Sequence, residues 1–249
     1  MPRRSDSSRP VRVLVPTLVT LLALALIAVA ADLAARAWAT DRVAAQLRTE
    51  YGLAQDPQVD VAGGSFLWQA ARGRFEDVTV TVDELTTEDD LLVRDLRVRL
   101  PAVDVPRSVL TGGAGTVDVA GGTVRAEVAY SDLAQRASVG GLDVTLRRDG
   151  DAVRAGTTVR VFGLGVDLGL TGRPVLEGSD VRLEPVRAEV AGASVPLRRA
   201  DQLLAAAGFD GFSFPLEGLP PQVRLDAISV ADDGLVVTGT VTPSAVRVG

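Results

Sequence analysis

Hydrophobic and polar positions along the 249-residue chain fall into three successive patterns. The first is a run without charged residues from Val13 to Ala31, preceded by four arginines and ended by Asp32. A run of about 19 residues of this kind after a basic segment is typical of a membrane anchor or an export signal. We therefore expect residues 1–12 to be a cytoplasmic basic tail, 13–31 an anchor or signal, and 32–249 an extracytoplasmic domain.

Two fates remain open for this run. Ala28-Val29-Ala30 has the small-x-small form of a cleavage site, which favours a removed signal peptide. The run is longer than the usual signal-peptide core of roughly 7 to 15 residues, which favours a retained anchor. The domain is thus expected at the extracytoplasmic face of the plasma membrane, or in the cell envelope if the signal is cleaved.

The second pattern has a helical period and extends from Asp32 to Tyr51. Apolar or small residues recur every three or four positions, and Gly52 follows as a residue type that commonly ends helices. The pattern predicts one amphipathic helix, which would continue straight out of the membrane if the anchor is retained. Its buried face is expected to carry Leu33, Ala37, Thr40, Ala44, Leu47 and Tyr51.

The third pattern alternates with a period of two and fills most of the chain after Gly52. Such alternation predicts antiparallel strands with one dry and one wet face, and hence a mostly antiparallel α+β fold. Turn residues predict hairpins at Gly121-Gly122, at Asp149 to Asp151 and at Asp232 to Gly234. Two short helices are expected, at Asp132 to Ala137 and at Arg198 to Ala207.

The chain contains no histidine and no cysteine. This excludes Ser-His-Asp and Cys-His nucleophiles, disulfides, and zinc sites built on imidazole or thiolate. Carboxylate pairs at Glu88-Asp89-Asp90 or Asp232-Asp233 remain open as a glycosidase or calcium site, but both fit turns between strands better. We expect no catalytic residue, no metal site and no cofactor, and therefore a protein that is not an enzyme.

The charge of the exported part limits its partners. Residues 1–31 carry four arginines and one aspartate, a net charge of +3, which leaves −9 for the rest because the whole chain carries −6. A domain this acidic argues against nucleic acid as a partner and against broad attraction to anionic lipid head groups.

Two stretches carry a resemblance to a known family. One runs from Val59 to Val80 and combines a short strand, a glycine pair, the Phe66-Leu67-Trp68 step and a glycine before a valine-rich strand. The other, Phe214 to Gly239, has a proline-rich step at Leu219-Pro220-Pro221 and a final hairpin. Together they resemble the LmeA-like phospholipid-binding proteins of actinobacteria over nearly the whole exported chain. One departure is Ser65, where family members often have a proline.

The resemblance implies a fold like that of tubular lipid-binding modules. In such modules a long helix lies against a strongly curved antiparallel sheet, and acyl chains occupy the space between them. It implies a non-enzymatic phospholipid-binding protein of the cell envelope that supports glycolipid or lipoglycan assembly, with phospholipid or glycolipid acyl chains and the plasma membrane as partners. The alternative is a membrane-anchored scaffold or protein-interaction domain with a closed core and no lipid.

Alternating strand positions are the expected lining of such a lipid site. Aromatic residues make up only 4% of the chain, and strand faces built from Val, Ala and Gly can leave room for acyl chains or simply pack closely. Three aromatic residues are placed near an opening, although they fit equally well as plugs of the core. The expected lipid-binding residues are Phe66, Trp68, Val78, Val80, Leu96, Val98, Leu164, Val166, Leu168 and Phe212, with Phe66, Trp68 and Phe212 at the opening.

Overall fold

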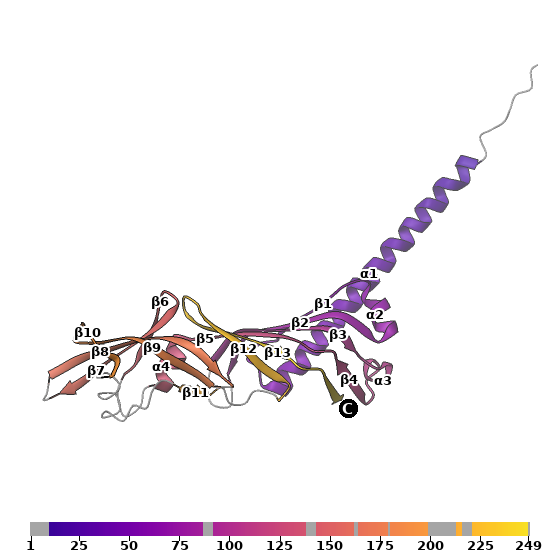
Figure 1. Cartoon of the computed structure of the whole chain (residues 1–249). Coiled ribbons are helices and arrows are strands. Elements are labelled where there is room, and N and C mark those ends of the chain that lie inside the picture. The colour runs from indigo at the N-terminus through magenta and orange to yellow at the C-terminus, as the bar shows by residue number, and fades with distance from the viewer. Residues whose placement is uncertain are drawn as a thin grey trace, which may run out of the picture.

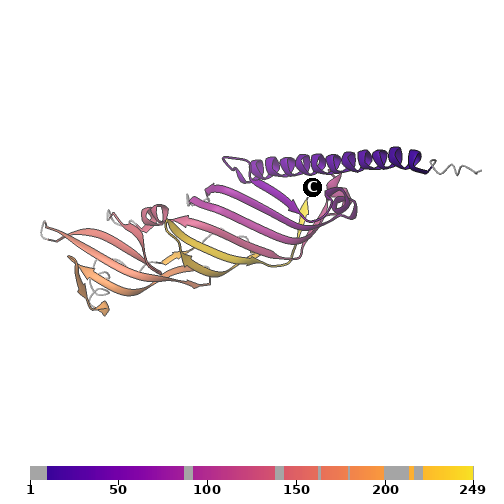
Figure 2. The same cartoon turned by 90° about the horizontal axis from the view of Figure 1, so that it is seen from above.

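The computed structural model describes residues 10–86, 92–137, 143–161, 164–178, 180–198, 213–215 and 221–248. A long helix, α1, projects from an elongated body (Figure 1). The body consists of two antiparallel sheets that follow one another along its long axis (Figure 2). The fold is α+β with mostly antiparallel, open sheets, which confirms the predicted class.

Helix α1 is continuous from Pro10 to Tyr51 and comprises 42 residues. At 1.5 Å per residue it extends about 63 Å, so the predicted apolar run and the predicted amphipathic helix form one element. Gly52, with a φ of 62°, follows its last residue as expected. Its described part is long and apolar enough to cross a membrane, and every side chain from Leu21 to Ala31 is exposed.

The side of α1 that contacts the domain differs in part from the prediction. Thr40, Ala44 and Leu47 are at least partly buried, as expected. Leu33, Ala37 and Tyr51 are exposed instead. The contact uses Ala35 and Ala39, which pack against a cluster of buried residues. Small alanines let the helix approach the domain closely, so the larger apolar residues do not mark the buried face.

The larger sheet lies beside the carboxyl-terminal half of α1 (Figure 2). Its strands are all antiparallel, and its main order is β1-β2-β3-β5-β13-β12, with β4 paired to both β3 and β14. Their bounds are β1 Gln58–Ala62, β2 Arg74–Thr86, β3 Leu92–Asp104, β4 Gly115–Val119, β5 Gly122–Ala129, β12 Val223–Val230, β13 Gly234–Val241 and β14 Ser244–Val248. Two short helices, α2 (Phe66–Arg72) and α3 (Arg107–Leu110), lie at the end of this sheet where α1 leaves the body (Figure 1).

The hairpin predicted at Gly121-Gly122 is wrong. β4 and β5 pair with the same strand, β3, in one register. On their other side they pair with β14 and β13, again in one register. Gly121 has a φ of 115°, and this positive φ bends the strand without reversing it. β4 and β5 are therefore one interrupted line, as are β13 and β14.

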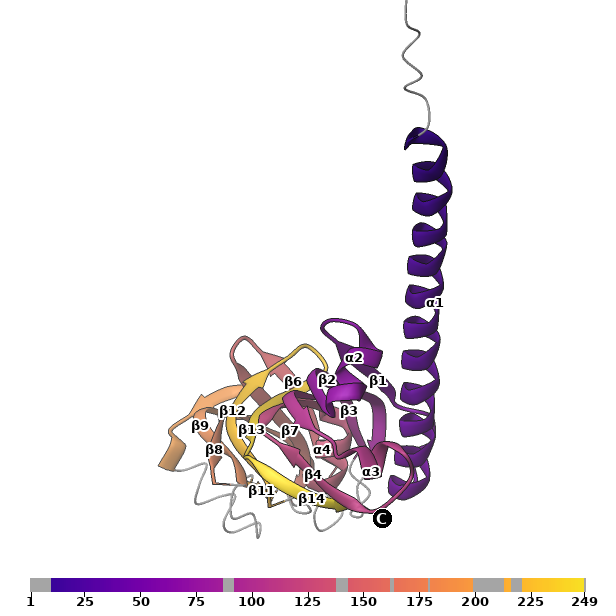
Figure 3. The ribbon, with the colours of Figure 1, turned by 90° about the vertical axis from the view of Figure 1, so that its right-hand side faces the viewer.

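The larger sheet is strongly curved (Figure 3), and two of its glycines sit where neighbouring strands come very close. A Cβ on Gly122 would lie 2.3 Å from the carbonyl oxygen of Arg99. A Cβ on Gly239 would lie 2.4 Å from the carbonyl oxygen of Arg224. Glycine in a strand interior commonly marks such a bend or close backbone approach. Neither position has room for a side chain unless the neighbouring strand moves.

The smaller sheet follows α4 (Tyr130–Ala137), which begins two residues before the predicted start. Its order is β10-β9-β8-β7-β6, with β11 also paired to β9. The bounds are β6 Thr145–Asp149, β7 Ala152–Val161, β8 Leu164–Glu177, β9 Asp180–Val190, β10 Ala193–Val195 and β11 Ser213–Pro215. The hairpin predicted at Asp149 to Asp151 joins β6 to β7, and the one at Asp232 to Gly234 joins β12 to β13, which confirms both.

Two clusters of buried apolar residues hold the body together. The proximal core lies near α1 and α2 and contains Val61, Phe66, Phe75 and Val103. The junction core lies where α4 and the ends of both sheets meet. It contains Val128, Tyr130, Leu133, Val144, Val153, Ala155, Leu170, Val181, Leu183, Ala188 and Leu235.

Some predicted features lie outside the described residues. They are the turn at Glu88-Asp89-Asp90, Phe212, and most of the helix expected from Arg198 to Ala207.

Gly122→Ala tests the close approach of β5 to β3 at this position. The added methyl group would collide with the backbone of β3, so we expect the free energy of unfolding to fall by about 1–3 kcal/mol. Gly64→Ala is the matched control, because nothing lies within 4 Å of a Cβ there. It should leave stability unchanged or raise it by up to ~1 kcal/mol. Urea denaturation of both variants measures the difference, and equal stabilities would contradict the steric explanation.

Candidate functional site

One face of the larger sheet carries an unbroken apolar row, named here the central row. Register pairing places one residue of each of six strands side by side along it. The row consists of Val59 (β1), Val80 (β2), Val98 (β3), Val124 (β5), Gly239 (β13) and Leu225 (β12).

The side chains of the central row are neither in a core nor fully exposed. Gly239 has no side chain, and the other five residues of the row are half-buried. Within the described part of the chain, none belongs to the proximal core or to the junction core. An ordinary packed interior would bury them completely, so this row is apolar surface that the described elements leave partly open.

Apolar side chains continue on both sides of the central row. Toward α2, Val61, Val78 and Leu100 are register partners and lead into the proximal core. Toward the junction core, Val82 faces Leu96. On the neighbouring strands the same side carries Ala126, Val237 and Ile228. The apolar face is therefore continuous from one core to the other.

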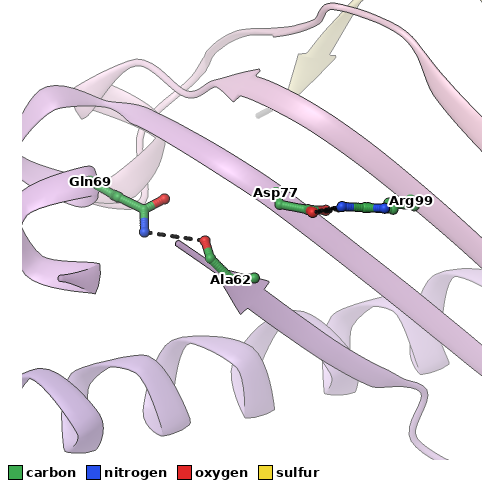
Figure 4. A network of polar contacts seen from close by, with 4 residues as sticks. All are labelled: Ala62, Gln69, Asp77 and Arg99. Carbon is green, nitrogen blue, oxygen red and sulfur yellow. Dashed lines mark hydrogen bonds and ion pairs between the residues drawn. The ribbon is translucent and has the colours of Figure 1, made fainter. Parts of the chain in front are cut away.

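The opposite face of the same strands is polar. One position away from the central row, the register partners are Asp60, Thr79, Arg99, Thr123, Thr240 and Arg224. Asp77 and Arg99 form an ion pair on this face, with Arg99 Nε 2.9 Å from Asp77 Oδ2 (Figure 4). The hydrogen bond from Arg99 lowers the pKa of Asp77. This contrast in polarity fixes which face of the sheet turns to water.

Two irregular residues delimit the regular part of the apolar face. Asp95 and Ala102 of β3 have positive φ angles of 47° and 59°, although neither is glycine. The β2–β3 pairing skips both of them. Beyond Ala102 the inward-facing positions of β3 shift by one residue. Val103 therefore lies in the proximal core, and Leu100 packs against that core.

The sequence-predicted residues fall into several groups. Val80 and Val98 belong to the central row, and Val78 and Leu96 lie in the rows beside it. Val166 and Leu168 are half-buried on β8 of the smaller sheet, while Leu164 at the start of β8 is 72% exposed.

Two of the predicted aromatic residues differ in their surroundings. Phe66 is buried and its ring centroid lies 5.8 Å from that of Phe75. Trp68 is 58% exposed on α2.

Sequence reasoning did not select Val59, Val124 or Leu225 for the site. The alternating pattern predicts strands along most of the chain after Gly52, but it does not say which strands are neighbours. A bulge between Leu225 and Ala227 also shifts the register of β12. As a result Ala227 is exposed, although it lies two residues after Leu225, and Ile228 takes the inward position.

The carboxylate of Asp32 attaches α1 to the start of α2. Asp32 accepts hydrogen bonds from Ser65 Oγ at 2.6 Å and from the amides of Phe66 at 3.0 Å and Leu67 at 2.8 Å. These bonds, led by the one from Ser65, lower the pKa of Asp32. One turn further on, Arg36 donates to the carbonyl oxygen of Gly64 at 3.1 Å.

Ser65 is also the N-cap of α2, since its Oγ accepts from the amide of Trp68 at 3.2 Å. The residue that departs from the resembled family pattern thus has a local role, because a proline there has no hydroxyl to offer.

A buried amide of α2 links the end of β1 to the start of β2. Gln69 is 3% exposed, and its Nε2 donates to the carbonyl oxygen of Gly64 at 3.3 Å. The same atom donates to the carbonyl oxygen of Ala62 at 3.4 Å (Figure 4). Its Oε1 accepts from the amide of Glu76 at 2.9 Å. A buried polar side chain with its bonds satisfied fixes the geometry of the surrounding backbone.

A groove of about 1070 Å³ lies on the smaller sheet. Its lining includes Arg147, Asp167 and the ion pair between Arg154 and Glu189. A charged lining of this kind does not suit hydrocarbon chains, because they would strip water from the charges without replacing its hydrogen bonds. The central row, which has no charged side chain, suits an apolar ligand better than this groove does.

Carboxylates in the described residues do not gather into a site. No group of three or more acidic side chains is placed to hold a metal ion there. Asp232 lies in a hairpin turn and forms an ion pair with Arg148.

Comparison with known proteins yields one match. Residues 30–240 match a family model described as LmeA-like phospholipid-binding. No curated protein and no solved structure matches the chain.

Asp32→Ala tests the fastening of α1. Because the folded-state pKa of Asp32 is lowered, the stabilisation from its carboxylate is present above the unfolded pKa of ~3.9 and is lost as pH falls through the lower folded value. The variant should therefore unfold at a lower temperature than the parent at neutral pH, and the gap should close below about pH 4.

Thermal unfolding of the full chain between pH 7 and pH 2 measures this gap. Asp41→Ala, which removes an exposed carboxylate from the same helix, should open no comparable gap. A gap for Asp32→Ala that is independent of pH would show that the charge of Asp32 is not the cause.

Proposed function

Since the chain belongs to the LmeA-like phospholipid-binding family, we propose that it holds phospholipid acyl chains against the central row of the larger sheet. The observation that supports this assignment is the half-buried state of Val59, Val80, Val98, Val124 and Leu225, which join neither core. Acyl chains would complete the burial that the described elements leave unfinished.

The size and chemistry of the surface suit hydrocarbon. Six neighbouring strands about 4.8 Å apart give the row a width of about 24 Å. Each methylene removed from water contributes about 0.8 kcal/mol, so a partly enclosed acyl chain supplies several kcal/mol without any charged contact. The central row contains no charged side chain, and the head group would accordingly remain outside it.

We also propose a membrane topology for the chain and a role for it in the envelope. We propose that residues 1–12 are cytoplasmic, because four arginines precede the apolar run. The domain then lies on the extracytoplasmic side, held by α1 or released into the envelope after cleavage. It has no catalytic function and supports the assembly of envelope glycolipid or lipoglycan by holding a lipid.

Val124→Trp, with Thr123→Trp as its control, tests the lipid site. Val124 lies in the middle of the central row, whereas the adjacent Thr123 is exposed on the polar face. The indole at position 124 should occupy the space of the acyl chain and remove most co-purifying phospholipid, at a cost of about 1–3 kcal/mol in stability. The indole at position 123 should leave bound lipid unchanged.

Mass spectrometry of lipid extracted from the purified full-length proteins measures the outcome. Retention of lipid by a folded Val124→Trp variant would place the lipid elsewhere. A parent protein without lipid, together with a Val124→Trp variant that fails to fold, would identify the row as an ordinary core and favour the scaffold alternative.

A further inference from the structure

Helix α2 is held at the level where the apolar part of α1 ends. The uncharged run ends at Ala31, and the next residue, Asp32, binds the first amides of α2. The two helices also pack against each other. If α1 crosses a bilayer, α2 is thus the element fixed closest to the point of exit (Figure 1).

Exposed apolar side chains gather at this place. Leu67 is 45% exposed and Trp68 is 58% exposed, whereas the preceding Phe66 is buried. Leu110, at the end of the neighbouring α3, is 42% exposed. Tryptophan and leucine on a rigid element are typical of surfaces that enter the boundary between head groups and acyl chains.

Arginines accompany these apolar side chains. The guanidinium carbon of Arg72 lies 4.3 Å from the centre of the Trp68 ring. Arg107 of α3 donates to the carbonyl oxygen of Ala71 at 2.8 Å, at the carboxyl end of α2. Guanidinium groups bind phosphates well, and a cation beside an aromatic ring suits the head-group region.

The charged residues named around α2 include more arginines than carboxylates, although the exported part as a whole is acidic. The positive residues around α2 are Arg36, Arg72, Arg74 and Arg107. The negative ones are Asp32, Glu76 and Asp104. Asp32 is already bound by the start of α2, and Asp104 is paired with Arg74. Arg72 and Arg107 thus leave this end of an otherwise acidic domain compatible with anionic lipid.

We infer that Leu67, Trp68 and Arg72 form a docking patch that rests on the anionic bilayer carrying α1. The occupant is a lipid surface because Asp32 holds the patch beside the residue where the apolar run ends. Trp68 and Leu67 enter the boundary region, and Arg72 pairs with lipid phosphates. The patch sets the orientation of the domain on the membrane, a property separate from acyl-chain binding on the central row.

The test uses the full chain with Trp38→Phe, which leaves Trp68 as the only tryptophan, since the chain contains two. The protein is reconstituted into vesicles of phosphatidylcholine and phosphatidylglycerol, with or without bromine on the acyl chains. We expect brominated lipid to quench the fluorescence of Trp68, and aqueous iodide to quench it weakly.

The matched control places the single tryptophan at the far end of the body. Leu164→Trp in a chain that also carries Trp38→Phe and Trp68→Phe has its indole at a position that is 72% exposed in the parent. This tryptophan should respond to iodide and not to brominated lipid. The control shows that quenching depends on position and not merely on attachment of the chain to a vesicle.

Two results would overturn the inference. One is a Trp68 that iodide quenches as strongly as the Leu164→Trp control, which would show that the patch is in water. The other is a Trp68 shielded from iodide but unaffected by brominated lipid, which would show that protein covers it. Neither result bears on the lipid content of the central row, so this test and that of the proposed function fail independently.

Discussion

The register of the larger sheet is the constraint on which the rest of the structure depends. Because side chains alternate across a strand, a shift of one residue in any ladder would exchange the apolar and polar faces of that strand. Six strands from distant parts of the chain keep the same phase, so that Val80, Val98 and Val124 share one face and Thr79, Arg99 and Thr123 the other. The continuous apolar face exists only because every ladder keeps this phase.

The apolar face of the larger sheet lies between the two cores. The proximal core closes one end around Phe66 and Phe75, and the junction core closes the other around Val153 and Leu235. Both consist of buried side chains, whereas the five side chains of the central row between them are only half-buried. The ends of the sheet are therefore packed more completely than its middle.

Local signals in the sequence predicted much of the fold. Alternation identified most strands, Gly52 the end of α1, and the turns at Gly150 and Asp232 to Gly234 two hairpins. The failure at Gly121-Gly122 has a physical cause, because a glycine pair suits both a reversal and a bend, and only the partners of the flanking strands decide between them. The contact face of α1 was partly missed since its approach depends on small alanines.

The candidate site was less accessible to sequence reasoning than the fold. Val78, Val80, Leu96 and Val98 were found because they lie on two adjacent strands with clean alternation. Val124 joins them through its pairing with Val98. Leu225 joins them only through Gly239, whose partner Val124 lies more than 100 residues earlier in the chain, and no local pattern records that pairing. The role of Asp32 was equally hidden, since its partners at Ser65 and Leu67 are more than 30 residues away.

The place of β13 in the sheet has a consequence for the order in which the chain folds. β5 ends at Ala129, yet the strand that covers its free edge begins only at Gly234. Until β13 has been synthesised and has paired with β5, one edge of β5 stays unpaired. β12 cannot join the sheet before then either, because among the described strands of this sheet it pairs only with β13. A chain that folds from its amino terminus onward would therefore complete its larger sheet only after residue 234 has joined β5.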